Sequence, residues 1–427
     1  MNIFKLIYYR SYQFILNKIA APFLNIKEPK LIKEENSIFK SVSILKENNY
    51  KKPFIFVTNS IYKSEVFSNL IEQMSKNNLE YYVYNNIKAD PSVKIVEETY
   101  YLYKENNCDS IIAIGGGSAI DLAKAVGILV TNKKKNISKY KGLLKVKKKI
   151  PFFIAIPTTA GTGSEATICS VITDEKNFDK YAINDPKLIP DYAILDNQLL
   201  KSVPQHIIST TGMDALTHAV EAYLGNALTK KTKEYSLKSI KLINENLLTF
   251  YNDSNNINSR ENVLYASYLA GISFTKSYVG YVHALSHSLG GKYHLSHGYL
   301  NAILLPYVLK KYGKKAVKKL KEIETYIDPS NKKEDKDKAN DFINRIIKSN
   351  EKMNIPSGFK NVIKKGDLDF LVNHAYKEAN PLYPVCKELT KKELKEILIE
   401  SEETLRNINW YFYCYYFCFR IYYFYKL

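Results

Sequence analysis

Residues 108–130 read CDSIIAIGGGSAIDLAKAVGILV, an apolar run followed by three glycines and a segment with helical periodicity. The apolar run at 111–114 predicts a buried strand, and the residues after Ser118 predict a helix. Strand, glycine turn and helix form a geometry in which backbone N–H groups and a helix N-terminus hold a pyrophosphate. The spacing is not GxGxxG, so the usual dinucleotide fingerprint is not matched. We expect Ser118 to cap the helix, with Asp121 at the capping-box position.

A second apolar run, residues 152–156, lies in KIPFFIAIPTTAGTGSEATICSVITD and ends at Pro157. The Thr, Gly and Ser residues that follow would make a poor core element, but their hydroxyls and bare backbone can line phosphate and ribose. Two such segments beside two strands predict a dinucleotide site.

The first half of the chain alternates strand and helix patterns, and from His206 onward the periodicity is helical almost throughout. Alternation of this kind predicts a parallel sheet covered by helices. Pro204 and the TTGMD segment mark the expected boundary. We therefore expect an α/β dinucleotide-binding domain at 29–205 and an all-α domain at 206–404, facing each other across a cleft. The expected elements of the first half are strands at 55–58, 81–84 and 111–114 and helices at 65–76 and 93–104.

Histidines cluster in the helical half, where four of the seven fall within residues 283–297. Asp214 and His218 in GMDALTHAVEAYL lie four apart, on one face of a helix. His283 and His297 come from GYVHALSHSLGGKYHLSHG, where we expect Gly290 and Gly291 to break a second helix. Three nitrogens and one oxygen suit Fe²⁺ or Zn²⁺ better than Mg²⁺ or Ca²⁺. The alternative is an ordinary solvated pair and a histidine-rich turn.

Four motifs taken together resemble the iron-containing (group III) alcohol dehydrogenases, from about residue 30 to residue 400. The resemblance implies an N-terminal Rossmann-like, parallel-sheet cofactor domain and a C-terminal helical metal-binding domain, in a dehydroquinate synthase-like architecture. The motifs are GGGSAIDLAK, PTTAGTGSE, GMDALTHAVEAY and GYVHALSHSLGGKYHLSHGYLNAILLPYVL.

The resemblance also implies roles for individual residues. It makes His287 the catalytic residue beside the nicotinamide and the alcohol oxygen. The implied metal ligands are Asp214, His218, His283 and His297. The implied cofactor-binding residues are Gly115, Gly116, Gly117 and Ser118 at the pyrophosphate, Thr158, Thr159 and Thr162 along the cofactor, and Lys180 at the nicotinamide-side ribose. Phe274 and Cys169 would border the substrate pocket. The alternatives are turn chemistry for the threonines, a surface lysine, and core packing for His287, Phe274 and Cys169.

Asn59 is a departure from the family pattern. The strand at 54–57 ends in TNS, where many members carry an Asp that binds the adenosine ribose. A carboxylate there repels a 2′-phosphate, and neutral Asn59 does not. We expect NAD first, with NADP also compatible.

The implied activity is hydride transfer between a nicotinamide cofactor and a small primary alcohol or aldehyde, with a divalent ion polarising the substrate oxygen. Iron is the expected ion, and zinc is compatible with the same ligands. One alternative is a polyol or glycerol-type dehydrogenase of the same superfamily. A non-enzymatic alternative is a basic protein that binds membranes or nucleic acid.

The composition is basic: 62 Lys and Arg against 43 Asp and Glu give a net charge of +19. The lysine clusters are not interleaved with a stacking platform or a DNA-reading motif, so we expect no nucleic acid partner. Five cysteines without a secretory cleavage pattern predict reduced thiols in the cytoplasm. We also expect a homodimer and no membrane attachment.

Both ends depart from the family pattern. Residues 1–28 form a basic extension, which we expect to fold as a helix packed on the cofactor domain. Its basic, amphipathic character would also suit a membrane surface or an organellar presequence. The tail at 405–427 includes WYFYCYYFCFRIYYFYKL, which is too short to span a bilayer comfortably and contains Arg420. We interpret it as the product of a frameshift or read-through, with membrane anchoring as the alternative.

Overall fold

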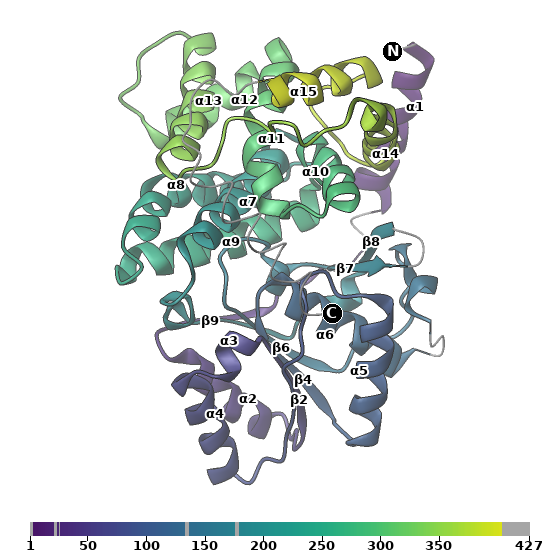
Figure 1. Ribbon diagram of the computed structural model, residues 1–427, viewed down its shortest axis with the longest axis vertical. Helices are drawn as coiled ribbons and strands as arrows, with labels where there is room; N and C mark the ends of the chain where they lie inside the picture. Colours follow the sequence, from purple (N-terminus) through teal and green to yellow (C-terminus); the bar gives the residue numbers. More distant parts are fainter. Residues whose placement is uncertain (1–2, 21–23, 25, 133–135, 176–178, 404–427) are drawn as a thin grey trace.

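The computed structural model describes residues 3–20, 24, 26–132, 136–175 and 179–403. An α/β half and a helical half lie one above the other along the long axis of the molecule (Figure 1). This is the α/β plus all-α organisation expected from the periodicity.

Six parallel strands form the main sheet of the described residues, in the order β1-β9-β6-β4-β2-β3. The inner strands β2, β4 and β6 are almost completely buried because helices cover both faces. The strands are β1 (Lys30–Lys33), β2 (Pro53–Val57), β3 (Tyr82–Tyr84), β4 (Ser110–Gly115), β6 (Phe152–Pro157) and β9 (Tyr192–Leu195).

The sheet has two apolar faces because side chains alternate along each strand. Ile112 pairs with Ile55 and Ile154, and these side chains belong to the larger core, which continues into the helical half. Ala113 and its neighbours face a second core, built with α5 and α6. The helices of this half are α2 (Lys40–Glu47), α3 (Asn59–Tyr62), α4 (Glu65–Lys76), α5 (Val93–Glu105) and α6 (Gly117–Thr131).

The strand order reverses between β2 and β4. From β2 the chain goes outward to β3, then crosses back to β4 and continues to β6 and β9 on the other side. Ligands of open α/β sheets bind at such a switch point, outside the carboxyl ends of the strands. The glycine turn after β4 and Asn59 after β2 both lie there.

A small second sheet joins β5 (Gly142–Leu143), β8 (Asp179–Asn184) and β7 (Cys169–Asp174). A fully buried lysine ties it to α6. Lys124 Nζ donates to the carbonyl oxygens of Ser164, Thr167 and Cys169 at 2.7–2.8 Å. Burial lowers the pKa of Lys124 to about 8. We call residues 157–165, which contain the Thr, Gly and Ser residues after β6, the hydroxyl-rich loop. The amine of Lys124 therefore fixes the end of this loop and the start of β7 against α6.

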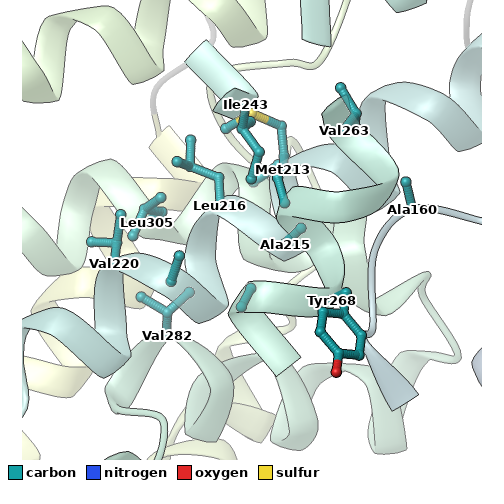
Figure 2. Close-up of a cluster of buried hydrophobic side chains, with 14 of the residues drawn as sticks. Ala160, Met213, Ala215, Leu216, Val220, Ile243, Val263, Tyr268, Val282 and Leu305 are labelled. Atoms are coloured by element: carbon teal, nitrogen blue, oxygen red, sulfur yellow. The ribbon is translucent and has the colours of Figure 1, made fainter. Parts of the chain in front are cut away.

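The helical half is built around α7, whose residues 212–224 are all buried. Figure 2 shows apolar side chains from α7, α8, α9, α10 and α11 gathered in one cluster around it. The helices are α7 (Gln205–Leu224), α8 (Lys230–Asn252), α9 (Ile257–Ser277), α10 (Tyr281–Tyr293), α11 (His297–Tyr312), α12 (Val317–Ile327), α13 (Asp335–Lys352), α14 (Leu368–Ala379) and α15 (Lys391–Glu403).

Two interruptions of helices expected from the sequence, a turn at TTGMD and a break at Gly290 and Gly291, are wrong. TTGMD is not a turn but lies inside α7, which begins directly after Pro204. Gly212 is needed there for packing, because a Cβ at this position would lie 2.2 Å from Leu247 of α8. Gly290 and Gly291 do not break α10, which runs to Tyr293 and ends at His294 in the left-handed conformation. Glycine costs a helix interior only about 1 kcal/mol, which tertiary packing overrides.

The N-terminal extension is helical as expected, with α1 (Ile3–Phe14) followed by a π-helical turn η1 (Ile15–Ala20). The expected partner of this helix is wrong. The side chains of Tyr9, Arg10 and Gln13 on α1 contact the helical half, at α14 and the segment after it. Figure 1 shows α1 at the edge of the helical half beside α14.

The tail at 405–427 lies outside the described residues, so the structure carries no test of its interpretation. Within the described part of the chain, no helix combines the length and the apolar character needed to cross a bilayer.

Candidate active site

The glycine turn and the hydroxyl-rich loop lie against each other. A Cβ built on Gly115 would stand 2.7 Å from Thr58 Cγ2, and one on Gly117 would stand 2.8 Å from Thr162 Cγ2. At Gly116 the nearest atom would be Thr159 Oγ1 at 3.1 Å. A larger residue at Gly115 or Gly117 would therefore displace a threonine side chain, and the three glycines bring their backbone to the N-terminus of α6.

The expected cap of α6 is wrong. Gly116 is the N-cap, so Ser118 is already in the first turn of the helix. Asp121 makes no capping box. Its Oδ1 accepts from Ser164 Oγ at 2.6 Å and its Oδ2 accepts from the Val171 backbone N–H at 3.1 Å. The carboxylate thus anchors the loop and β7 to α6, a long-range contact that local spacing cannot reveal.

The remaining cofactor candidates lie at the same edge of the sheet. The Thr158 N–H donates to Gly115 O at 3.1 Å, which joins the loop to the end of β4. Thr58 Oγ1 is buried and has no hydrogen-bond partner among the described residues. Asn59 follows it as the exposed first residue of α3. A polar ligand bound at this switch point would give the Thr58 hydroxyl the hydrogen-bond partner that it lacks.

The same loop reaches the helical half through two further glycines. A Cβ on Gly161 would lie 2.6 Å from Thr211 Cβ on α7. Gly163 has φ +59° and meets Gly271 of α9 backbone to backbone, so that a Cβ on either residue would stand 2.6–2.7 Å from the other. Residues 157–165 therefore connect the glycine turn directly with α7 and α9.

Asp214, His218, His283 and His297 converge as the spacing predicts. One ligand-type atom from each lies within 4.8 Å of all the others. Asp214 Oδ1 is 3.5 Å from His297 Nε2, 3.9 Å from His218 Nδ1 and 4.0 Å from His283 Nε2. Ligand atoms about 2.1 Å from a tetrahedral ion are about 3.4 Å apart, so this cluster is close to that spacing.

The chemistry of these residues fits a divalent ion. His218 Nδ1 is buried and has no hydrogen-bond partner among the described residues. Burial lowers the pKa of His218, and burial together with the neighbouring imidazoles holds the pKa values of His283 and His297 well below their usual range. The imidazoles are therefore neutral, which is the form that binds metal.

The segment order explains why these side chains meet. Asp214 and His218 share one face of α7, and His283 lies in the first turn of α10. His297 begins α11, and the next residue, Gly298, touches α7 directly. A Cβ on Gly298 would lie 2.3 Å from the Thr210 carbonyl oxygen. This contact brings the start of α11 against α7 and places His297 beside Asp214.

Two buried residues that sequence reasoning missed hold the cluster. Glu221 accepts from the Gly280 and Val282 backbone N–H groups at 2.8 Å and lies 2.6 Å from His283 Nδ1, so it leaves Nε2 facing the cluster. Burial raises the pKa of Glu221 to about 7, and the N–H groups oppose this shift. A signal existed, because Glu221 lies seven residues, or two turns, after Asp214.

Asn301 is the second missed residue. Its Nδ2 donates to Asp214 Oδ1 at 2.6 Å and lies 3.1–3.2 Å from the Nε2 atoms of His297 and His283. The Asn301 Oδ1 accepts from Ser286 Oγ. This amide therefore touches three members of the cluster. A sequence signal existed for it, because Asn301 lies four residues, or about one turn, after His297.

His287 lies one turn after His283, and its ring stacks on that of His297 with the centroids 5.0 Å apart. Its Nδ1 is 2.6 Å from Glu378 Oε1, which also accepts from Tyr383 OH at 2.8 Å. With Nδ1 engaged, Nε2 is the nitrogen left for a reacting group. Glu378 was not expected, because 91 residues separate it from His287.

The other expected site residues differ in how closely they approach the cluster. The Phe274 ring stacks on His218 with the centroids 4.3 Å apart. Lys180 on β8 pairs with Asp90 at 2.6 Å, and its charge contributes to lowering the pKa of His297, after burial and His287. Cys169 is half-buried in β7, and its carbonyl oxygen accepts from Lys124. Phe274 thus borders the cluster, whereas the contact of Cys169 with Lys124 holds β7 against α6.

Comparison with known proteins agrees with this arrangement. Residues 29–197 match the iron-containing alcohol dehydrogenase family, and residues 208–401 match the C-terminal domain of the same family. Alcohol dehydrogenase 4 of Saccharomyces cerevisiae is 36% identical over 373 residues, which are 86% of this chain and 96% of the yeast protein.

Two further relatives extend the comparison. The NADPH-dependent butanol dehydrogenase of Clostridium saccharobutylicum is 34% identical over 75% of this chain and 83% of its own length. The structure of an alcohol dehydrogenase from Oenococcus oeni superposes with a TM-score of 0.84 at 30% identity, covering 88% of this chain and 100% of the other.

A parallel-sheet domain with a glycine turn at its switch point, set against a helical domain with an Asp/His cluster, defines a class of two-domain oxidoreductases. Within that class, this chain belongs to the iron-containing alcohol dehydrogenase family.

Proposed function

We propose that this protein transfers a hydride between a nicotinamide dinucleotide and a small primary alcohol or aldehyde, with Asp214, His218, His283 and His297 holding a divalent ion. The observation that carries the proposal is the convergence of these four side chains beside a loop that also contacts the glycine turn. We propose iron as the resident ion, with zinc accepted by the same donor set.

Each part of the site has a separate task in this proposal. A bound ion supplies Lewis-acid polarisation of the substrate oxygen, and the nicotinamide supplies or accepts the hydride. Gly115, Gly116, Gly117 and Ser118 hold the pyrophosphate, Thr158, Thr159 and Thr162 line the cofactor, and Lys180 approaches the nicotinamide-side ribose. His287 moves the proton between the substrate oxygen and solvent. Phe274 narrows the substrate pocket, which Cys169 also borders.

A substrate panel tests this function. Purified protein would be stripped of metal, reloaded with Fe²⁺ or Zn²⁺, and assayed with small alcohols and aldehydes and with both NAD(H) and NADP(H). We expect turnover of small primary alcohols and aldehydes that depends on metal reloading. Metal-independent turnover, or turnover of glycerol-type polyols alone, would contradict the proposal. The polyol alternative is not favoured over this proposal, because the relatives described above are named as alcohol and butanol dehydrogenases.

We propose that the adenosine end of the site accepts either NAD or NADP. Asn59 is neutral and exposed at the end of β2, and one relative is named as NADPH-dependent. The domain limits 29–205 and 206–404, the homodimer and the cytoplasmic location stay predictions from the sequence.

Asn59→Asp is expected to move cofactor preference toward NAD(H). A carboxylate at this position repels a 2′-phosphate, so the ratio of kcat/KM for NADPH to that for NADH should fall by about 10-fold, which is about 1.4 kcal/mol. Steady-state kinetics with both cofactors give the ratio.

Ser60→Asp is the matched control, because it adds the same charge one residue later in the exposed start of α3. We expect the control to change the ratio much less. Equal shifts in the two variants would mean that general charge, and not contact with the ribose, sets the preference.

Glu378→Gln is expected to lower kcat by about 10-fold or more, because the charged acceptor that fixes the His287 tautomer is lost. The metal content should remain unchanged, since Glu378 is not one of the four clustered residues. Stopped-flow measurement of proton release alongside hydride transfer would show the loss at the proton step.

Tyr383→Phe removes only the second hydrogen bond to the same carboxylate oxygen and serves as the control. We expect a smaller fall in kcat than in Glu378→Gln. An unchanged kcat in Glu378→Gln would exclude a role of this carboxylate in proton transfer.

A further inference from the structure

The N-terminal helix α1 is oriented so that the side chains of Arg10 and Gln13 face the rest of the protein. Arg10 donates to Val385 O at 2.9 Å and to Glu388 Oε2 at 2.6 Å. Gln13 is buried and donates to Tyr383 O at 2.9 Å and to Pro381 O at 3.1 Å. These contacts fix the rotation of α1 about its own axis, because only one face of the helix carries side chains that can make them.

The opposite side of α1 and η1 is an apolar surface that stays exposed within the described part of the chain. Its residues recur three, four or seven positions apart, so they share one broad face of the helix. We call these residues the outer face: Ile3 (60% exposed), Phe4 (77%), Ile7 (55%), Tyr8 (58%), Phe14 (60%), Ile15 (55%) and Ile19 (53%). Scattered exposed apolar residues are ordinary, but seven on one face of an eighteen-residue segment, with the exposed side chains of Ser11 and Lys18 among them, mark an interaction site.

The charged side chains of the segment that carries the outer face are all positive, and the carboxylate that contacts this segment, Glu388, pairs with Arg10 on the docked side. Residues 1–27 contain no Asp or Glu, and Lys5 and Lys18 are exposed at the two ends of the helical segment. The chain as a whole carries a net charge of +19. A basic helix with a wide apolar face is suited to the boundary between the headgroups and the acyl chains of an anionic bilayer.

We propose that the outer face of α1 and η1 docks on an anionic lipid surface, with the helix lying in the plane of the interface. Figure 1 shows α1 at the edge of the molecule, where a flat surface can reach it. The segment lies on the membrane and does not cross it, since no described helix has the required length and apolar character. The family assignment says nothing of this segment, because the matched regions begin at residue 29.

A second copy of the chain is a poorer occupant on electrostatic grounds. If two outer faces paired in antiparallel fashion about a two-fold axis, Lys5 of one copy would approach Lys18 of the other. No carboxylate within residues 1–27 is available to compensate these charges. Anionic lipid supplies the missing negative charge and the apolar contact together.

Vesicle co-sedimentation of the full-length protein tests the proposal. The probes are phosphatidylcholine vesicles and vesicles of phosphatidylcholine mixed with phosphatidylglycerol. We expect sedimentation with the mixed vesicles that weakens as salt is raised. Ile7→Glu places a carboxylate in the outer face and should lower the apparent binding constant by at least about 10-fold. Arg10 and Gln13 are untouched in this variant, so α1 stays docked on the helical half.

Ile257→Glu is the matched control. It makes the same substitution at a side chain that is 46% exposed, at the first residue of α9, where an acidic residue is tolerated. We expect this variant to bind vesicles as the parent does, and both variants to keep their dehydrogenase activity. Residues 404–427 are present in every protein compared, so their contribution cancels.

Three results would overturn the proposal. One is equal binding by Ile7→Glu and the parent. Another is equal binding to neutral and mixed vesicles at all salt concentrations. The third is absence of lipid binding combined with a dimer, seen by analytical ultracentrifugation, that Ile7→Glu dissociates, because a second copy would then cover the outer face.

Discussion

Asp214→Ala should lose at least about 1,000-fold in kcat/KM for aldehyde reduction, because the only carboxylate of the four-residue cluster would be removed. The bound ion should be lost as well, since three neutral imidazoles remain without a counter-charge. His283→Ala should behave in the same way, because His283 is the imidazole that Glu221 orients. Elemental analysis of metal-loaded protein and steady-state kinetics measure the two effects.

His206→Ala is the control for these variants, since His206 is exposed near the start of the same helix that carries Asp214. We expect it to keep both metal and turnover. Full aldehyde reduction by Asp214→Ala and His283→Ala would refute the metal assignment. Retained metal with lost turnover would instead move the two residues from binding to catalysis.

Gly117→Val is expected to weaken nicotinamide cofactor binding by about 10-fold or more while the metal content stays the same. Its Cβ would stand 2.8 Å from Thr162 Cγ2, so the turn and the hydroxyl-rich loop must move apart. The backbone N–H groups of the turn would then leave the positions from which they can hold a pyrophosphate. NADH fluorescence titration gives the dissociation constant, and thermal unfolding reports the accompanying loss of stability, about 1–3 kcal/mol for an overpacked contact.

Gly291→Ala is the control for that substitution. No atom lies within 4 Å of a Cβ at Gly291, which sits in the interior of α10. We expect unchanged cofactor binding and a gain in unfolding free energy of about 0.5–1 kcal/mol. If Gly117→Val proves too unstable to purify, Gly117→Ala introduces the same first atom with less bulk. Normal NADH affinity in a folded Gly117 variant would exclude the glycine turn as the pyrophosphate site.

The fold and the four-residue cluster were predictable because both depend on local periodicity. The strand at 111–114, the three glycines and the helix after them occur as expected, and α4 spans the predicted residues. Asp214 and His218 meet because residues four apart share a helix face, and the histidine-rich segment supplied the other two members of the cluster. Each of these predictions needs only neighbours in the sequence or a motif set known from a family.

The predictions that were wrong, and the site residues that were missed, depend mostly on contacts between distant segments of the chain. Ser118 was expected to cap α6, but the N-cap is Gly116, two residues earlier, which lies against Thr159. The glycines of α10 were read as breakers, since their effect on a helix is decided by packing and not by propensity alone. Glu378 has no spacing that connects it with His287, 91 residues away, and Asn301, although one turn after His297, has none that connects it with Asp214 or His283. The rotation of α1 about its own axis, which leaves its apolar face exposed, is set by carbonyl groups more than 350 residues away in the chain.

The backbone contact between Gly163 and Gly271 tells protein engineers which residues of α9 can be substituted and which cannot. Phe274, three residues after Gly271, presents an aromatic ring to His218 and, under the proposed function, is the position to randomise when a different alcohol is wanted. Gly271 is not a suitable position to randomise, because any side chain there would clash with Gly163 of the hydroxyl-rich loop. Libraries that vary residue 274 while holding 163 and 271 constant should therefore contain a much larger share of folded clones than libraries that vary all three.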